Sequence, residues 1–321
     1  MTAAGTPLPA EFSLIARHFA PLAGPGTDGL RDDVAVLTPP PGRDLVLKAD
    51  ALVEGVHFLP TDPADLVARK LLRVNLSDLA GKGAIPIGYL LTISVPRGTP
   101  DAWFEAFAAG LAQDQREFSL YLLGGDTTST PGPISLSLTA IGHAAPGAVP
   151  RRGGASAGDE IWVTGTIGDG ALGLAVAQGR LSDPTGHLLD RYRLPRPRLG
   201  LALGGLAGAS MDVSDGLLQD LSHICRHSSL AAEVALASVP LSAPAREAGP
   251  DWLPVILNGG DDYEVLLTAP VARAGDLAAA ASRAGIPLTR IGKMVAGNSE
   301  VRVLDAAGKP LSLKSAGWSH F

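Results

Sequence analysis

This 321-residue chain has only one cysteine, and it lacks long apolar runs and an excess of basic residues. The single cysteine, Cys225, excludes an internal disulfide framework and is typical of a reducing compartment. The wholly apolar runs are far shorter than the about 18 residues of a membrane-spanning helix. The first residues lack the basic flank and long apolar core of a secretory signal. We therefore expect a soluble, cytoplasmic protein with no membrane partner.

The charge balance excludes one class of partner and leaves another open. The formal net charge of −6 argues against a nucleic-acid partner, because nucleic-acid-binding proteins normally carry a basic face. It does not exclude phosphate ligands, since divalent cations can reverse the local sign of the charge. The pattern G-x-x-x-x-G-K-[ST], which marks P-loop kinases, is also absent. Nucleotide binding, if present, must use another arrangement.

Apolar, β-rich segments alternate with segments rich in alanine and leucine, which favours an α/β or α+β fold. The stretch at 145–158 is rich in Gly, Ala and Pro and is typical of a linker. Before it we expect helices at 11–19, 64–80 and 101–116 and strands at 34–37, 44–50, 89–95, 120–125 and 134–142. After it we expect helices at 170–178, 216–227 and 271–284 and strands at 160–165, 210–214, 231–236, 255–260, 263–269 and 301–305. The pattern predicts two domains, at 1–145 and 150–321.

The stretch SMDVSDGLLQDL at 210–221 contains three aspartates and no lysine or arginine. Two carboxylates about 4 Å apart repel by roughly 4 kcal/mol at an effective dielectric constant of 20, so they point apart or a positive group lies between them. Aspartates beside small residues recur in LRDDVAVL, LVLKADALVEGVHF, NLSDLAGKGA, LLGGDTT, TIGDGALG and LNGGDDYEV. One such aspartate is usually a helix cap or a turn residue. The whole set is typical of Mg²⁺ ions around a polyphosphate, which suggests ATP.

Two other motifs indicate different chemistry. Residues 168–173 match G-x-G-x-x-G after an expected strand, as in a dinucleotide-binding oxidoreductase. The acidic residue expected about 20 positions later would be Asp190, which lies in HLLDRYR instead of at the end of a strand. His223 and His227 lie four residues apart on an expected helix without the glutamate of zincins, so packing or surface roles are favoured over zinc.

Over essentially its whole length, the chain resembles the thiamine-monophosphate kinase family. The motifs that carry the resemblance are, in order, EFSLIARHF, DDVAVL, VEGVHFLP, NLSDLAGKGA, GGDTT, RRGGASAGDEIWVTGTIGD, MDVSDGLLQDL, NGGDDYE and GWSHF. The resemblance implies transfer of the γ-phosphoryl group of ATP to thiamine monophosphate with Mg²⁺, giving thiamine diphosphate and ADP. It also implies the two-domain α/β fold of the aminoimidazole-ribonucleotide-synthetase superfamily, with the N-terminal sheets forming a homodimer interface.

The same resemblance, carried over position by position, implies the site residues. The implied Mg²⁺ ligands are Asp33, Asp50, Asp78, Asp126, Asp212 and Asp215, and the catalytic ones among them are Asp78, Asp212 and Asp215. The implied ATP contacts are Gly125, Asp126, Arg152 and Ser214. The implied contacts to thiamine monophosphate are His57, Asp261 and Trp318. Ordinary roles remain open for three of these: a solvated linker arginine, a structural histidine and a packed C-terminal tryptophan.

Several positions depart from the family's usual residues. Arg31 replaces a glycine, Asp261 replaces a glutamate, and Gly81-Lys82 replaces Ala-Met. Lys48-Ala49 replaces a pair of hydroxyl residues before Asp50, which removes a hydroxyl ligand and adds a cation that can partly replace a metal's charge. The Lys48-Ala49 change keeps open a non-catalytic protein that binds ATP or a thiamine phosphate. Another ATP-using member of the superfamily and an NAD(P) oxidoreductase also remain open.

Overall fold

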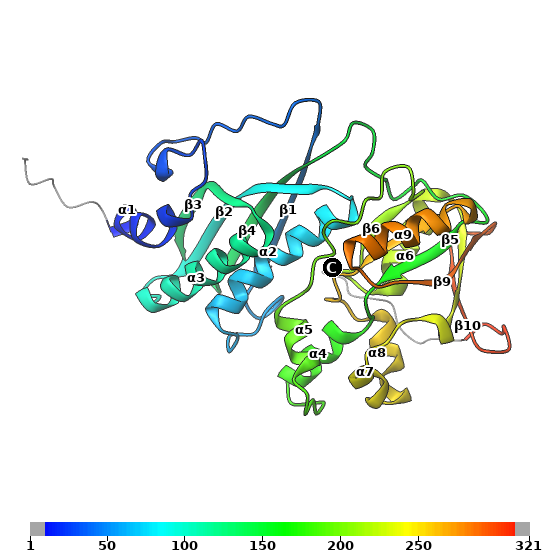
Figure 1. The fold of residues 1–321 in the computed structure, drawn as a ribbon. Coiled ribbons are helices and arrows are strands. Elements are labelled where there is room, and N and C mark those ends of the chain that lie inside the picture. Colours follow the sequence, from blue (N-terminus) through cyan, green and yellow to red (C-terminus); the bar gives the residue numbers. More distant parts are fainter. Residues whose placement is uncertain (1–9, 312–321) are drawn as a thin grey trace, which may run out of the picture. The chain divides into compact units, whose positions relative to one another are not determined.

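The computed structural model describes residues 10–311, which form two compact units. Unit 1 takes the described residues up to Pro41, together with Leu45–Asn75 and Pro86–His143. Unit 2 takes Gly42–Asp44, Leu76–Ile85 and the described residues from Ala144 onward. Figure 1 shows the elements of both units. None of the helices in the described part combines the length and apolar character that a membrane crossing requires.

Unit 1 contains a four-stranded sheet in the order β1-β4-β2-β3. Strands β2 and β3 are parallel and are connected through the helix α3, which makes a βαβ unit. Figure 1 shows the helices α2 and α3 on the same side of this sheet. The elements are α1 (Ala10–Leu14), β1 (Asp44–Val53), α2 (Ala64–Gly81), β2 (Ile85–Pro96), α3 (Asp101–Phe118), β3 (Tyr121–Thr130) and β4 (Ser135–Ala144). A π-helical turn, Ile15–Phe19, continues α1.

Helices α2 and α3 are joined by a buried carboxylate. Asp114 of α3 is fully buried and accepts hydrogen bonds from Arg69 Nε at 2.8 Å and Arg73 Nε at 2.6 Å. On the same helix, Phe104, Phe107 and Leu111 recur at helical spacing and are buried. The ion pairs therefore attach α3 to α2, and the apolar stripe buries α3 in the core of unit 1.

Unit 2 contains a six-stranded mixed sheet in the order β10-β7-β9-β5-β8-β6. Its neighbouring strands are antiparallel except β10 and β7, which are parallel. Two apolar clusters form its core. The strands are β5 (Glu160–Thr164), β6 (Ser210–Asp212), β7 (Ala231–Ala235), β8 (Val265–Ala269), β9 (Leu288–Val295) and β10 (Val301–Leu304). The helices are α4 (Asp169–Ala177), α5 (His187–Arg193), α6 (Leu217–Ser228), α7 (Ala243–Glu247), α8 (Leu253–Asn258) and α9 (Ala274–Ala284).

Two sequence-based predictions of strands are wrong. Residues 34–37 form no strand, and Val34 and Val36 are 64% and 72% exposed. The apolar run at 255–260 lies largely in α8, which begins with Pro254 in its first turn. A short apolar run fits a buried strand or a buried helix equally well, so periodicity alone did not separate them. The sequence analysis also missed α5, α7 and β9.

Candidate active site

The turn after β6 presents three polar side chains close together. Asp212 ends β6 and is 4% exposed, while Ser214 and Asp215 are half-buried in the turn that leads into α6. Gly216 closes the turn with a φ of 118°, and a Cβ atom there would lie 2.5 Å from the carbonyl oxygen of Asn258. Glycine is therefore required at this position, and the turn is held in one shape.

The third carboxylate of the stretch, that of Asp220, points inward and holds this turn. Its Oδ2 accepts hydrogen bonds from the backbone N–H groups of Ser214 at 3.0 Å, Asp215 at 3.0 Å and Gly216 at 3.2 Å. Burial, together with the charge of Asp215, raises the pKa of Asp220 to about 7, against the effect of the three N–H donors. Asp220 therefore holds the turn through its Oδ2 atom.

Positive charge reaches β6 from two segments that are distant in sequence. Lys82 follows the last residue of α2, and its Nζ donates a hydrogen bond to the carbonyl oxygen of Ser210. The Ser210 hydroxyl in turn donates to the carbonyl oxygen of Gly81 at 2.5 Å, so the end of α2 is attached to β6. On another segment, the carbonyl oxygen of Arg151 accepts the Ser210 N–H at 3.2 Å, which brings Arg151 and Arg152 to this edge strand.

The pKa of Lys82 depends on the charges of both acids and arginines near β6. Burial, and then the charges of Arg152 and Arg151, lower its pKa to about 8, while the carboxylates of Asp212 and Asp78 act in the opposite direction. The acidic crowding in the sequence is therefore balanced by cations from elsewhere in the chain. Both alternatives raised by the sequence therefore occur: Asp220 turns inward, and the positive Lys82 lies close to Asp212.

The NGGDDYE segment lies against the same turn. Asp261 N–H donates to the carbonyl oxygen of Ser214 at 2.9 Å, and Tyr263 N–H donates to that of Val213 at 2.8 Å. Asp261 and Tyr263 have φ values of 71° and 52°, in the left-handed region that non-glycine residues rarely adopt. The Tyr263 hydroxyl donates to Asp261 Oδ1 at 3.1 Å. Strained backbone of this kind is typical of functional sites, and here it orients the Asp261 carboxylate.

The donor atoms beside the turn fit a hard divalent cation. One ligand atom each of Asp215, Asp220 and His223 lie within 4.8 Å of one another. Burial and the charges of Arg226 and Arg152 lower the pKa of His223, with Asp215 acting against them. Arg152 interacts electrostatically with both Lys82 and His223, so this cluster and the acids close to Lys82 lie around the same arginine. Two of the three ligand atoms of the cluster are carboxylate oxygens, which Mg²⁺ prefers, so the cluster fits this ion.

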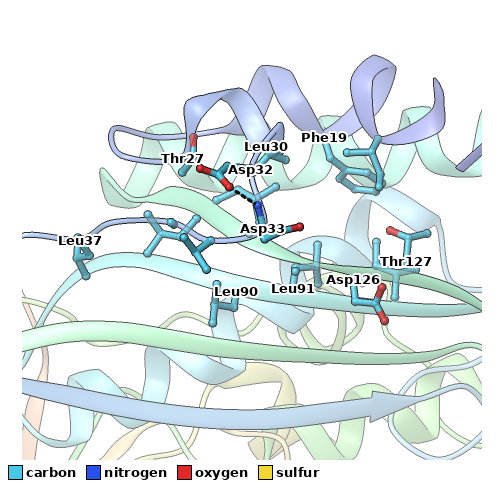
Figure 2. Close-up of a pocket in the computed structure, with 18 of the residues that line it drawn as sticks. Phe19, Thr27, Leu30, Asp32, Asp33, Leu37, Leu90, Leu91, Asp126 and Thr127 are labelled. Atoms are coloured by element: carbon cyan, nitrogen blue, oxygen red, sulfur yellow. Dashed lines mark hydrogen bonds between the residues drawn. The ribbon is translucent and has the colours of Figure 1, made fainter. Parts of the chain in front are cut away.

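Unit 1 has a pocket of about 440 Å³ with two of the predicted metal ligands in its lining. Figure 2 shows Asp33 on the segment above the sheet and Asp126 on the strand below it. Beside Asp126 lies Gly125, whose φ is 157° and where a Cβ atom would lie 1.7 Å from the carbonyl oxygen of Leu91. The close approach of β2 and β3 therefore requires a glycine at this position of the GGD motif. This packing explains the glycine without any phosphate ligand.

Two further predicted residues of unit 1 lie outside this pocket's lining. The carboxylate of Asp50 on β1 forms an ion pair with Lys48 Nζ at 3.0 Å. The Nδ1 atom of His57 accepts the backbone N–H of Val53 at 3.0 Å, which fixes the ring after the end of β1. Asp50 therefore already has a positive partner, and His57 has a structural hydrogen bond through its Nδ1 atom.

The structure brings one group of predicted residues together in unit 2. This group comprises Asp78, Arg152, Asp212, Ser214, Asp215 and Asp261. In unit 1, Asp33, Gly125 and Asp126 share the pocket. Trp318 lies outside the described residues. Sequence reasoning missed Lys82, Asp220 and Tyr263 as site residues: Lys82 stood out only as a departure from the family, and nothing local marked Tyr263.

The glycine-rich motif at 168–173 has a structural explanation. The N–H groups of Gly168 and Gly170, at the start of α4, donate to the carboxylate of Asp262 at 2.7 and 3.1 Å. A Cβ atom on Gly173 would lie 2.0 Å from the carbonyl oxygen of Leu188. The chain's own carboxylate thus takes the N–H groups that a dinucleotide's phosphates would need, and the alternative of a dinucleotide-binding oxidoreductase loses its support.

Comparison with protein families finds matches in both halves of the chain. Residues 31–144 match the family described as AIR synthase related protein, N-terminal domain. Residues 156–305 match the corresponding C-terminal domain. The thiamine-monophosphate kinase of Caulobacter vibrioides is 44% identical to this chain, over 97% of this chain and 91% of that protein.

Two solved structures show the same fold. The thiamine-monophosphate kinase from Stenotrophomonas maltophilia K279a is 40% identical, with a TM-score of 0.79 over 88% of this chain and 91% of that chain. A structure of AaThiL complexed with AMPPCP and TMP is 29% identical, with a TM-score of 0.77 over 90% of this chain and 91% of that chain. The expected two-domain α/β architecture is therefore confirmed.

Proposed function

This chain belongs to the thiamine-monophosphate kinase family, and on that premise we propose that it transfers the γ-phosphoryl group of ATP to thiamine monophosphate. The relative crystallised with AMPPCP and TMP supports this pair of ligands. The observation in the chain itself that carries the proposal is the mixed-charge surface of unit 2. There Asp78, Asp212 and Asp215 lie with Lys82 and Arg152 around one turn.

The reaction needs positioning and charge neutralisation more than it needs a base. An oxygen of the acceptor phosphate attacks the γ-phosphorus in line, and the bond from that phosphorus to the ADP oxygen breaks. The acceptor's second pKa is about 6, so at pH 7 it is mostly a dianion and has no proton to remove. A covalent phospho-enzyme is unnecessary, because electrostatic stabilisation accounts for most of the rate in this class of reaction.

The cofactor of the proposed reaction is Mg²⁺. We assign it to the carboxylates that the family resemblance indicates, which are Asp33, Asp50, Asp78, Asp126, Asp212 and Asp215. When bound, Mg²⁺ neutralises phosphate charge and orients the attacking and leaving oxygens. In unit 2 the turn around Gly216, held by Asp220, keeps Asp212 and Asp215 in fixed positions before any ligand arrives. Such preorganisation lowers the cost of assembling the charged site.

The remaining predicted residues bind the two substrates. The Arg152 guanidinium offers a planar fork to phosphate oxygens, and Ser214 offers a hydroxyl beside it. Gly125 and Asp126 contribute from the pocket of unit 1. For thiamine monophosphate we assign His57, Asp261 and Trp318. The carboxylate of Asp261, which Tyr263 orients, complements the cationic thiamine.

We further propose a cytoplasmic homodimer. Unit 1 exposes apolar side chains on β1 and on the segment before it: Val34, Val36, Leu45 and Leu47 are 45–72% exposed. Strand β1 is an edge of its sheet, and a second copy of the chain would remove these side chains from water. Sedimentation of the wild-type protein and of Leu47→Lys tests this. A dimer that the lysine dissociates supports the interface, and a wild-type monomer at micromolar concentration contradicts it.

Product formation tests the enzyme assignment. The purified protein is incubated with ATP, Mg²⁺ and thiamine monophosphate, and thiamine diphosphate is separated by chromatography. Asp78→Asn and Asp215→Asn should each lower turnover by about a hundredfold or more, because each removes one carboxylate charge from the proposed metal site. The control is Asp276→Asn, which alters an exposed acid paired with Arg273 on α9 and should leave turnover unchanged. No product above background, with ATP still bound in calorimetry, would indicate a non-catalytic binding protein.

A further inference from the structure

Lys82 lies among the carboxylates of the proposed site, although neither the motifs nor the family pattern assigns it a function. Its Nζ donates to the carbonyl oxygen of Ser210, and it interacts electrostatically with Asp78 and Asp212. An ammonium group has three N–H donors, and the hydrogen bond to Ser210 uses one of them. The backbone contact therefore holds the charge beside β6, while further donors remain for anionic ligands.

The position of the charge is set by packing on a glycine. A Cβ atom on Gly81 would lie 3.0 Å from the Asp212 nitrogen and 3.1 Å from the Met211 carbonyl carbon. The last turn of α2 thus lies directly against β6, and Lys82 is the next residue along the chain. Arg152 adds a second positive charge close enough to lower the pKa of Lys82, so this edge carries two cations near its acids.

We propose that Lys82 is a built-in positive charge of the phosphate-binding site, which competes with Mg²⁺ for Asp78 and Asp212 and attracts the phosphates of ATP directly. This inference rests on the proposed function, because it takes Asp78 and Asp212 as Mg²⁺ ligands. A residue of this kind replaces part of the charge that divalent ions otherwise supply. It therefore has opposite effects on the two ligands: it weakens the binding of the metal alone and strengthens the binding of metal-free nucleotide.

Unit 1 contains a second pair of the same kind. There Lys48 Nζ lies 3.0 Å from Asp50 Oδ1, with the two side chains 30% and 41% exposed. A lysine therefore lies close to a proposed Mg²⁺ ligand in each unit. This repetition supports a function for the lysine charge rather than an isolated accident of packing.

Calorimetry on Lys82→Gln separates the charge from the hydrogen bond, because glutamine keeps an N–H donor for Ser210 and removes the charge. The protein is first freed of metal. MgCl₂ is then titrated into protein without nucleotide, and ATP is titrated into protein in the presence of EDTA. We expect Lys82→Gln to bind Mg²⁺ on the order of tenfold more tightly and metal-free ATP on the order of tenfold more weakly. Lys82→Arg keeps the charge and should resemble the wild type in both titrations.

Opposite shifts support the inference, and any other result overturns it. A purely structural lysine would change both affinities in the same direction or neither. Lys309→Gln, which alters an exposed lysine of unit 2, controls for the loss of net charge. If circular dichroism shows that Lys82→Gln does not fold, Lys82→Met is used in the same titrations. Because neither titration measures product, failure of this inference is distinguishable from failure of the kinase assignment.

Discussion

Asp220→Ala tests the reasoning about the turn that carries Asp212, Ser214 and Asp215. The substitution removes an oxygen that accepts three backbone N–H groups at 3.0, 3.0 and 3.2 Å. With about 1 kcal/mol for each hydrogen bond, the free energy of unfolding should fall by about 3 kcal/mol. Asp220→Asn should cost less than about 1 kcal/mol. It keeps an acceptor oxygen, and because burial raises the pKa of Asp220 to about 7, a neutral side chain suits the site.

The same variant should also lower turnover. A displacement of about 1 Å in a positioning element can cost about a hundredfold in rate, so we expect Asp220→Ala to lose between tenfold and about a hundredfold in kcat. Urea unfolding followed by circular dichroism measures the stability, and chromatography of thiamine diphosphate measures the rate. An Asp220→Ala protein within about 0.5 kcal/mol of wild type, with normal kcat, would refute the role of this carboxylate, since that is the scale of neutral surface changes.

Three further predictions follow from single contacts. Tyr263→Phe removes the hydrogen bond to Asp261 and should raise the KM for thiamine monophosphate severalfold, with kcat nearly unchanged. Steady-state kinetics measure both constants, and a fall in kcat alone would contradict the prediction. Burial raises the pKa of the Cys225 thiol to about 11, so the native protein should resist a thiol-specific disulfide reagent at pH 8. The stability contributed by the protonated thiol should be lost as the pH rises from about 9 toward 11. Rapid modification of Cys225 without unfolding would disprove the protection of this thiol. Gly216→Ala should lower the melting temperature by several degrees, because its Cβ atom would lie 2.5 Å from the Asn258 carbonyl oxygen; an unchanged melting temperature in a thermal scan would show that the turn adapts.

Local patterns in the sequence were sufficient for most of the elements. The helices around 64–80 and 101–116 follow from segments rich in alanine and leucine, and most strands follow from short apolar, β-rich runs. The prediction of a strand at 255–260 was wrong, because a short apolar run has no periodicity that distinguishes a helix such as α8 from a strand. The prediction of a strand at 34–37 was wrong for a different reason. Val34 and Val36 are apolar but exposed, so their hydrophobicity does not indicate a buried core strand.

The sequence by itself determined which residue types could hold a metal and a phosphate. It also determined that the motifs containing them are those of a known protein family. Only the tertiary structure decided how the charges pair. It placed Lys82 close to Asp212 and Arg152 close to Lys82, turned Asp220 inward, and filled the start of α4 with Asp262. The reason is that helix and strand patterns depend on neighbours a few residues apart, whereas Lys82 meets β6 and Asp262 meets α4 through contacts between segments 128 and 94 residues apart, which leave no local signal.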